Sequence, residues 1–239
     1  MISVCIATYN GASVILSQLN SILPQLGEED EVIISDDRST DGTCAVVEAL
    51  HDPRVRIVQG PAKGSPIPNF EHALRMAAGD YIFLSDQDDK WLPGKVAVSI
   101  GKLRHGYDCV VTDCVVTDSD FHVTHPSFFA LNHTHENRFY NLLVKNGYIG
   151  GCMAFTRRVR DLSLPFPANI PMHDMWIGNV AAFQYKVAFI HRPCSCFRRS
   201  GHNVSTSAGK SSNSYYLRFL LRLRVARGLL QLKRRACNV

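Results

Sequence analysis

The sequence predicts one α/β domain in which helices flank a mostly parallel, Rossmann-like sheet. Its 239 residues suffice for a single domain with a sizeable core that does not depend on disulfides or a structural metal. Through the first hundred residues, short apolar runs alternate with helix-like stretches, as in βα units that feed a parallel sheet. Polar clusters follow three of the first four apolar runs, and the carboxyl ends of parallel strands meet at one edge.

The first half of the domain, residues 1–105, contains four expected strands and three expected helices. The strands are Ile2–Ala7, Glu31–Ser35, Val55–Val58 and Tyr81–Ser85. The helices are Ser13–Leu23, which Pro24 helps to end, about Thr43–Leu50, and a stretch that Asn69 caps and that continues to Ala78. The Gly- and Pro-rich segment Gly60–Pro68 is expected to be a loop.

The second half of the domain, residues 106–205, has a mixed pattern. The expected strands are Cys109–Val116, Gly151–Thr156 and Lys186–Ile190, and the expected helices are Phe139–Lys145 and Asp174–Phe183. The Ser-, Gly- and Asn-rich segment Gly201–Ser214 is expected to be a mobile loop. Residues 206–239 are therefore predicted to form a flexible loop and a basic tail.

Positive charge is concentrated in that tail. Residues 215–239 hold seven Lys or Arg and no acid, whereas the whole chain carries +5, so residues 1–214 sum to −2. Because the rest of the chain has no basic patch interleaved with aromatic residues, nucleic acid is not an expected partner. If the tail is helical, one apolar stripe runs along it, formed by Leu217, Leu221, Val225, Leu229 and Leu232. The composition favours docking on an anionic inner-membrane surface, and packing on the domain or on a second subunit is the alternative.

The composition indicates neither a membrane span nor a zinc site. No run approaches the ~18 apolar residues that cross a bilayer, and Ile2–Ala7 is too short for the apolar core of a signal peptide. The eight cysteines are dispersed without Cys-x-x-Cys pairs, as expected for small buried residues in a reducing compartment. We therefore expect a cytoplasmic protein, with the tail placing it at the inner face of the membrane.

The acidic run Asp86-Gln87-Asp88-Asp89 directly follows the fourth expected strand. Asp86 and Asp88 lie two residues apart, so extended backbone would turn both carboxylates to one side. A divalent cation would relieve their repulsion, and hard oxygen ligands suit Mg²⁺ or Mn²⁺, which keep coordination positions for phosphate oxygens. The alternative is a solvated acidic turn, but an apolar strand that runs straight into the acids favours the metal site.

Three short motifs occur in order along the chain. They are Ser3–Asn10, the pair Asp36-Asp37 before Ser39–Thr43, and the Asp-x-Asp-Asp run before Trp91-Leu92-Pro93. In this order they resemble the family 2 glycosyltransferases of the GT-A fold, over roughly residues 1–205. The resemblance implies a half that binds a nucleotide diphosphate-sugar donor, residues 1–105, and an acceptor-binding, catalytic half, residues 106–205. It implies as acceptor a saccharide or a lipid-linked saccharide.

The resemblance also implies roles for individual residues. The backbone around Thr8, Tyr9 and Asn10 and the side chain of Asp36 would hold the base and ribose of the donor. Asp88 would bind the metal ion directly. Asp86 would contact the ribose or the water shell of the metal.

In this family a carboxylate that opens a later helix serves as catalytic base, and Asp174 has the matching position. It is also suited to cap that helix. His173 before it departs from the commonest acidic pair, and the resulting His-Asp-Met-Trp run resembles rhamnosyltransferase-like members that build bacterial surface polysaccharides. Weaker resemblances place Gly151 at the sugar site and His202 near the diphosphate or metal, against a tight turn and an exposed loop as alternatives.

The chemistry requires such an arrangement independently of the resemblance. Displacing a nucleoside diphosphate from an anomeric carbon builds charge on the leaving group, which a divalent ion neutralises. One positioned carboxylate takes the acceptor proton, and attack opposite the leaving group inverts the anomeric carbon. We therefore expect an inverting enzyme that uses dTDP-rhamnose or a UDP-hexose, and the His-Asp feature favours dTDP-rhamnose.

Other function classes fit the sequence less well. A sugar nucleotidyltransferase would carry a Gly-rich, basic phosphate loop after the first strand, which Thr8–Gly11 lacks, and a dehydrogenase would carry G-x-G-x-x-G there. A phosphatase with an Asp-x-Asp-x-Thr motif would need Thr where Lys90 stands. Processive synthases of the family carry a Gln-x-x-Arg-Trp segment that the sequence lacks, so one sugar per encounter is expected. A non-catalytic nucleotide-sugar-binding protein stays open as an alternative.

Overall fold

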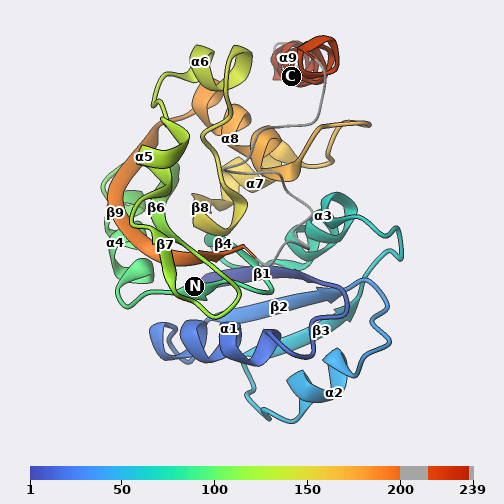
Figure 1. The fold of residues 1–239 in the computed structure, drawn as a ribbon. Helices are drawn as coiled ribbons and strands as arrows, with labels where there is room; N and C mark the ends of the chain where they lie inside the picture. The colour runs from blue at the N-terminus through green and yellow to red at the C-terminus, as the bar shows by residue number, and fades with distance from the viewer. Residues whose placement is uncertain (200–214, 237–239) are drawn as a thin grey trace.

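The computed structural model describes residues 1–199 and 215–236 and is built around one nine-stranded mixed sheet (Figure 1). The strand order is β3-β2-β1-β4-β8-β6-β9-β5, and β7 pairs with β6. Four strands of the first half pair in parallel: β1 (Ile2–Thr8), β2 (Glu31–Asp36), β3 (Val55–Gln59) and β4 (Tyr81–Asp86). The predicted α/β architecture with a parallel sheet half is thereby confirmed.

The strands of the second half extend the same sheet. They are β6 (Cys109–Thr117), β8 (Met153–Thr156), β9 (Val187–Arg198) and the short β5 (Lys90–Trp91) and β7 (Val123–His125). β8 runs antiparallel to both β4 and β6, whereas β9 runs parallel to β6. β9 continues to Arg198, well beyond the predicted end at Ile190. The end of this strand lies beside the acidic run, where the Arg198 N–H donates to Asp89.

The helices cover both faces of the sheet. They are α1 (Ile15–Ile22), α2 (Thr43–Glu48), α3 (Pro66–Met76), α4 (Lys95–Arg104), α5 (Phe128–Asn132), α6 (Arg138–Leu143), α7 (Arg157–Ser163), α8 (His173–Gln184) and α9 (Tyr215–Ala236), with 3₁₀ turns at Leu23–Gln25 and Gly150–Cys152. The sequence did not predict α4, α5 or α7. α3 starts at Pro66, inside the predicted loop, because proline suits the first turn of a helix. Asn69 is therefore not a cap but lies buried within α3, where its Nδ2 donates to the Thr8 carbonyl at 3.2 Å.

Alternate residues of the parallel strands pack on opposite faces. Val4 and Ile6 of β1 face α1 and α4, whereas Cys5 faces the core that α3 and α8 build. Figure 1 shows α1 and α2 on one side of β1–β3 and α3 on the other. Because helices cover both faces of the sheet, a binding site is expected at the edge where the carboxyl ends of β1 and β4 lie.

The tail helix α9 packs on the domain beside α6 and α8 (Figure 1). Its Val225 and Leu229 are buried in the core, and a Cβ at Gly228 would lie 2.7 Å from Cζ3 of Trp176. Val225, Leu229 and Leu232 of the stripe predicted from the sequence thus pack on the domain, as in the alternative to membrane docking, whereas Leu217 is exposed. None of the helices in the described ranges combines the length and apolar character needed to traverse a bilayer.

Candidate active site

A cleft of about 490 Å³ opens at the carboxyl ends of β1 and β4. Loops after these strands, the first turns of α3 and the start of α8 form its walls. Its lining includes seven residues that the sequence predicted for the site: Thr8, Tyr9, Asn10, Asp86, Asp88, His173 and Asp174. Residues separated by up to 166 positions in the chain, Thr8 and Asp174, therefore share one cavity.

The loop after β1 is held by side chains from other elements. Gln87 clamps Tyr9: its Oε1 accepts from the Tyr9 N–H at 3.0 Å and its Nε2 donates to the Tyr9 carbonyl at 3.2 Å. The Asn10 N–H donates to Ser39 Oγ at 2.8 Å, and Asn10 Oδ1 accepts from the Thr40 N–H at 2.9 Å. This backbone is thus fixed to the acidic run on one side and to the loop after β2 on the other.

Asp36, whose side chain is predicted to contact the donor, is not among the residues that line the cleft. Its carboxylate is used inside the fold, where it accepts hydrogen bonds from Thr8 Oγ1 at 3.0 Å and from the N–H and Oγ of Ser39 at 2.8 and 2.5 Å. The neighbouring Asp37 lines the cleft instead and accepts from the Lys63 and Gly64 N–H groups. Asp36 thus shapes the loop, whereas Asp37 lines the cleft.

The acidic run brings several carboxyl groups together at the end of β4. Burial, and then the charges of Asp88 and Asp174, raise the pKa of Asp86 to about 7. Burial also raises the pKa of Asp88. Asp89 lies behind them, where burial and the two other acids raise its pKa, and its Oδ1 accepts from the Arg198 N–H at 3.0 Å. A divalent cation fits such a set, because hard carboxylate oxygens are its ligands and its charge would favour their ionised forms.

Lys95 and Gly151 lie behind the acids. The sequence did not predict a role for Lys95, and it predicted a different role for Gly151. Lys95 is fully buried, contacts the Gly151 carbonyl through its Nζ and lies 4.5 Å from the centroid of the Trp91 ring. Gly151, predicted at the sugar site, does not line the cleft, whereas Gly150 does. A Cβ at Gly151 would lie 2.9 Å from Asp89 Oδ2 and 3.2 Å from Asp86 Oδ2. Gly151 therefore supports the acids from behind, since only a glycine lets the backbone approach them.

Asp174 stands in the first turn of α8 with its carboxylate at the cleft wall. Oδ2 accepts from the Gly150 N–H at 3.3 Å, and Oδ1 accepts from the Met175 N–H at 2.5 Å. Burial raises its pKa to about 6, which is close to the pH at which a general base works best. The carboxylate is thus oriented by backbone donors and chemically suited to accept a proton.

His173 is a buried residue of the cleft without polar partners. Neither of its ring nitrogens has a hydrogen-bond partner among the described residues, and its side chain is 4% exposed. The ring stacks on Phe70 with 4.0 Å between centroids. Burial lowers its pKa to about 3, so the imidazole is neutral near pH 7. Buried polar atoms without partners are rare in proteins, so these nitrogens are suited to a bound ligand.

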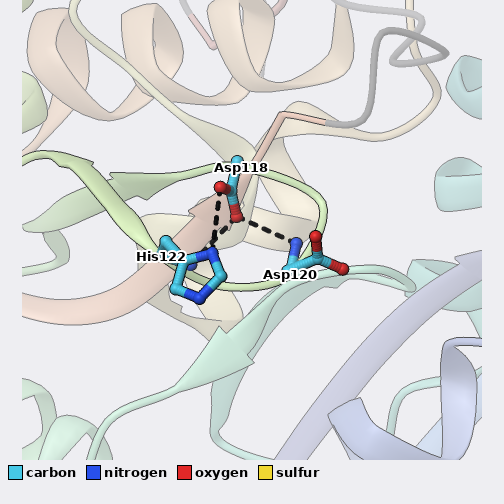
Figure 2. A group of neighbouring side chains, drawn as sticks. All are labelled: Asp118, Asp120 and His122. Atoms are coloured by element: carbon cyan, nitrogen blue, oxygen red, sulfur yellow. Dashed lines mark hydrogen bonds and ion pairs between the residues drawn. The ribbon is translucent and has the colours of Figure 1, made fainter.

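A second acidic group lies in the turn between β6 and β7 (Figure 2). Asp118, Asp120 and His122 are the one set in the described ranges with three ligand atoms within 4.8 Å of one another. Asp118 Oδ1 accepts from the N–H groups of Asp120 and His122, both at 2.9 Å, and its Oδ2 lies 3.2 Å from His122 Nδ1. These bonds account for the cluster as a turn. The predicted His202 lies outside the described residues.

Comparison with known proteins identifies the family. The model of the family described as "Glycosyl transferase family 2" matches residues 3–162. The chain belongs to glycosyltransferase family 2. The match contains Asp86, Asp88 and the loop after β1 and ends before Asp174.

Related glycosyltransferases act in bacterial saccharide assembly. A *Campylobacter jejuni* GalNAc(5)-diNAcBac-PP-undecaprenol beta-1,3-glucosyltransferase is 30% identical over 48% of this chain and 38% of its own length. The *Escherichia coli* UDP-Glc:alpha-D-GlcNAc-diphosphoundecaprenol beta-1,3-glucosyltransferase WfgD is 26% identical over 88% of this chain and 81% of its own length. The *Shigella flexneri* dTDP-rhamnosyl transferase RfbG is 34% identical over 44% of this chain and 36% of its own length. The chain thus matches under half the length of the first and third of these relatives.

Solved glycosyltransferases share the fold. *Staphylococcus aureus* TarS 1-349 in complex with UDP-GlcNAc superposes with a TM-score of 0.72 at 18% identity, over 95% of this chain and 66% of TarS. Glucosyl-3-phosphoglycerate synthase from *Mycobacterium tuberculosis*, in complex with Mn²⁺, UDP and phosphoglyceric acid, gives 0.60 at 19% identity, over 97% of this chain and 78% of that enzyme. At these identities the likeness concerns the fold, and it confirms the predicted GT-A fold.

Proposed function

We propose that this family 2 chain is an inverting, metal-dependent glycosyltransferase that moves one sugar from a nucleotide diphosphate donor to an acceptor hydroxyl. The observation that carries the proposal is that Asp86, Asp88 and Asp174 line one cleft together with the loop Thr8–Asn10. The metal ligands, the nucleotide-binding loop and the base of such a reaction need this proximity, because the diphosphate and the anomeric carbon are adjacent in the donor. A sugar nucleotidyltransferase is less well supported, because the family model matches another class.

The donor would lie along the loop after β1 with its diphosphate towards the acids. Asp88 would hold Mn²⁺ or Mg²⁺, and Asp86 would contact the ribose or the water shell of the ion. When bound, the ion neutralises the charge that develops on the leaving diphosphate. One direct carboxylate ligand leaves most coordination positions to phosphate oxygens and water, as is usual for Mg²⁺ sites. The Mn²⁺ and UDP named with the *M. tuberculosis* enzyme support this assignment.

Asp174 would accept the proton of the acceptor hydroxyl as that oxygen attacks the anomeric carbon. The N–H groups of Gly150 and Met175 hold the carboxylate in position and leave its remaining lone pairs for the hydroxyl. One base opposite the leaving group produces inversion. The neutral imidazole of His173, which lines the cleft next to Asp174, would form a hydrogen bond with a sugar hydroxyl as donor or acceptor.

The proposed donor is dTDP-rhamnose or a UDP-hexose, and the His173-Asp174 pair favours dTDP-rhamnose. Both donor classes are named among the relatives, through RfbG for dTDP-rhamnose and WfgD for UDP-glucose. The proposed acceptor is a saccharide or a lipid-linked saccharide of bacterial surface polysaccharide synthesis, reached at the cytoplasmic face of the membrane. The undecaprenol-linked acceptors named for the *C. jejuni* and *E. coli* enzymes support this choice.

The test is a transfer assay on the purified chain. dTDP-rhamnose and UDP-hexoses are offered in turn with saccharide and lipid-diphosphate-linked saccharide acceptors, in Mn²⁺, Mg²⁺ or chelator, and products are identified by mass spectrometry. We expect one sugar per acceptor, dependence on the metal, and an inverted anomeric configuration by NMR. If the chain binds the donor but neither transfers the sugar nor hydrolyses the donor, the non-catalytic alternative is favoured. Activity with UDP-sugars alone would exclude dTDP-rhamnose as the donor.

A further inference from the structure

Large exposed apolar side chains gather at one end of the molecule. Twelve such side chains are exposed in the described chain, and seven of them belong to α9 or to α6 with the residue that follows it. Isolated exposed apolar residues are ordinary on protein surfaces, whereas a contiguous group marks an interaction site. The concentration of exposed apolar side chains on these two helices therefore indicates an interaction surface.

The helix α9 has two apolar faces, not one. Val225 and Leu229 are buried against the domain, as described above. Tyr216, Phe219 and Leu230 are 72%, 58% and 61% exposed. They recur at intervals of three and eleven residues, which at 3.6 residues per turn places them on one side of the helix, opposite Val225.

The helix α6 adds to this outer face. Phe139 and Leu143 lie four residues apart on one side of α6, and Val144 follows them; all three are more than half exposed. α6 and α9 lie in contact, and the Arg222 guanidinium contacts the Val144 carbonyl. Six of these seven exposed side chains form what we name the outer patch: Phe139, Leu143, Val144, Tyr216, Phe219 and Leu230.

Positive charge borders the outer patch. Arg224 and Arg227 of α9 are exposed, as are Arg138 and Lys145 at the two ends of the α6 segment. The segment 137–145 contains no acid, and α9 contains seven Lys or Arg and no acid. The combination of apolar side chains with basic ones is typical of helices that lie at the boundary between lipid head groups and acyl chains.

We propose that the outer patch docks the chain on the surface of a bilayer that contains anionic phospholipids. Its apolar side chains would enter the acyl boundary, while the arginines contact head-group phosphates. A second copy of the chain is the less suitable occupant, because a symmetric contact through α9 would bring the exposed Arg224 and Arg227 of both copies together. The outer patch would be the surface that holds the chain at the membrane face named in the proposed function. It does not depend on the transfer reaction, since none of its six residues lines the cleft.

Point variants test the surface better than removal of the tail, because truncation would uncover the core around Val225 and Leu229. The full chain is sedimented with vesicles of phosphatidylcholine alone or with 30% phosphatidylglycerol. The variants are Phe219→Ser/Leu230→Ser for the apolar part and Arg224→Gln/Arg227→Gln for the charge. Matched controls at exposed positions elsewhere are Leu16→Ser/Val123→Ser and Lys102→Gln/Arg104→Gln.

We expect binding to the anionic vesicles and little binding to pure phosphatidylcholine. Each arginine near an anionic surface contributes on the order of a fivefold change in partitioning, so the arginine pair variant should bind roughly twentyfold more weakly. The apolar pair variant should lose at least tenfold, and both controls should bind like the wild type. Far-ultraviolet circular dichroism checks that the variants are folded.

The proposal is overturned if the wild type ignores anionic vesicles, or if the patch variants bind as well as the controls. It is also overturned if light scattering shows a dimer that the apolar pair variant converts to a monomer, because a second copy then covers the patch. Transfer to a water-soluble acceptor should be unchanged in all four variants. A failed membrane test with intact transfer thus separates this surface from the proposed reaction.

Discussion

Replacing Gly151 with Ala tests whether the backbone behind the acidic run holds its carboxylates in place. A Cβ at this position would lie 2.9 Å from Asp89 Oδ2 and 3.2 Å from Asp86 Oδ2, against 3.4 Å for an ordinary contact. The Asp89 carboxylate must therefore retreat by about 0.5 Å and the Asp86 carboxylate by about 0.2 Å. Asp89 is 4% exposed and its Oδ1 accepts from the Arg198 N–H, so this retreat must take place within a packed interior.

Two quantities should change in the Gly151→Ala variant. Crowding a packed interior by one methyl group costs about 1–3 kcal/mol in the free energy of unfolding. Displacing Asp86 alters the support of the metal ligands, and such changes weaken metal binding by roughly tenfold to a hundredfold. We therefore expect a less stable protein that needs about tenfold more Mn²⁺ for half-maximal transfer.

The assay pairs urea unfolding, followed by tryptophan fluorescence, with a Mn²⁺ titration of sugar transfer. Gly101→Ala is the matched control, because Gly101 lies in α4 and a Cβ there meets nothing within 4 Å. That substitution should stabilise the fold by about 0.4–1 kcal/mol and leave the Mn²⁺ requirement unchanged. If Gly151→Ala instead unfolds and responds to Mn²⁺ like the wild type, the support that we assign to Gly151 is wrong.

Three further predictions concern the cleft itself. Asp88→Ala should weaken binding of UDP or dTDP with Mn²⁺ at least tenfold by calorimetry, and unchanged affinity would remove Asp88 from the metal site. Asp174→Asn should lower kcat about a thousandfold with donor affinity intact, and kcat of the wild type should fall as pH drops through about 6, because a raised pKa leaves the base protonated below it. The pKa of Asp174 in the folded state exceeds the ordinary value of 3.8, so the folded protein keeps this proton up to a higher pH than the unfolded protein does. The free energy of unfolding therefore falls as the pH rises from 3.8 to about 6. At pH 8, Asp174→Asn should accordingly resist urea better than the wild type does. His173→Phe should keep the stack on Phe70 without loss of stability but raise the KM for donor or acceptor about tenfold, and an unchanged KM would mean that the ring contacts no sugar.

The parallel half of the sheet could be predicted because its strands are apolar runs that end in polar residues. Helices such as α5 and α7 could not, since they span too few turns to show a helical period. The predicted strand at Gly151–Thr156 starts at Met153 because Gly150–Cys152 form a 3₁₀ turn that places Gly151 behind the acids.

Asp86, Asp88 and Asp174 could be assigned to one site because the carboxyl ends of the strands share an edge and because the motif order indicated the base. The sequence named Asp36, and that Asp37 lines the cleft could not be predicted, since it depends on the bonds that Thr8 and Ser39 make to the Asp36 carboxylate. Buried Lys95 gave no signal, because its contact with Gly151 joins residues 56 positions apart. Local pattern predicts where strands end, whereas partners from distant segments decide which side chain reaches the cleft.

The central claim is that Asp88 after β4 holds the metal ion to which the diphosphate binds, and that Asp174 at the start of α8 faces the reacting sugar in the same cleft. A crystal structure of the chain with a nucleoside diphosphate and Mn²⁺ tests it most directly. The account predicts Mn²⁺ between Asp88 and the phosphate oxygens, the nucleoside along Thr8–Asn10, and Asp174 open towards the anomeric side. Mn²⁺ at Asp118, Asp120 and His122 with the nucleotide outside the cleft would contradict it.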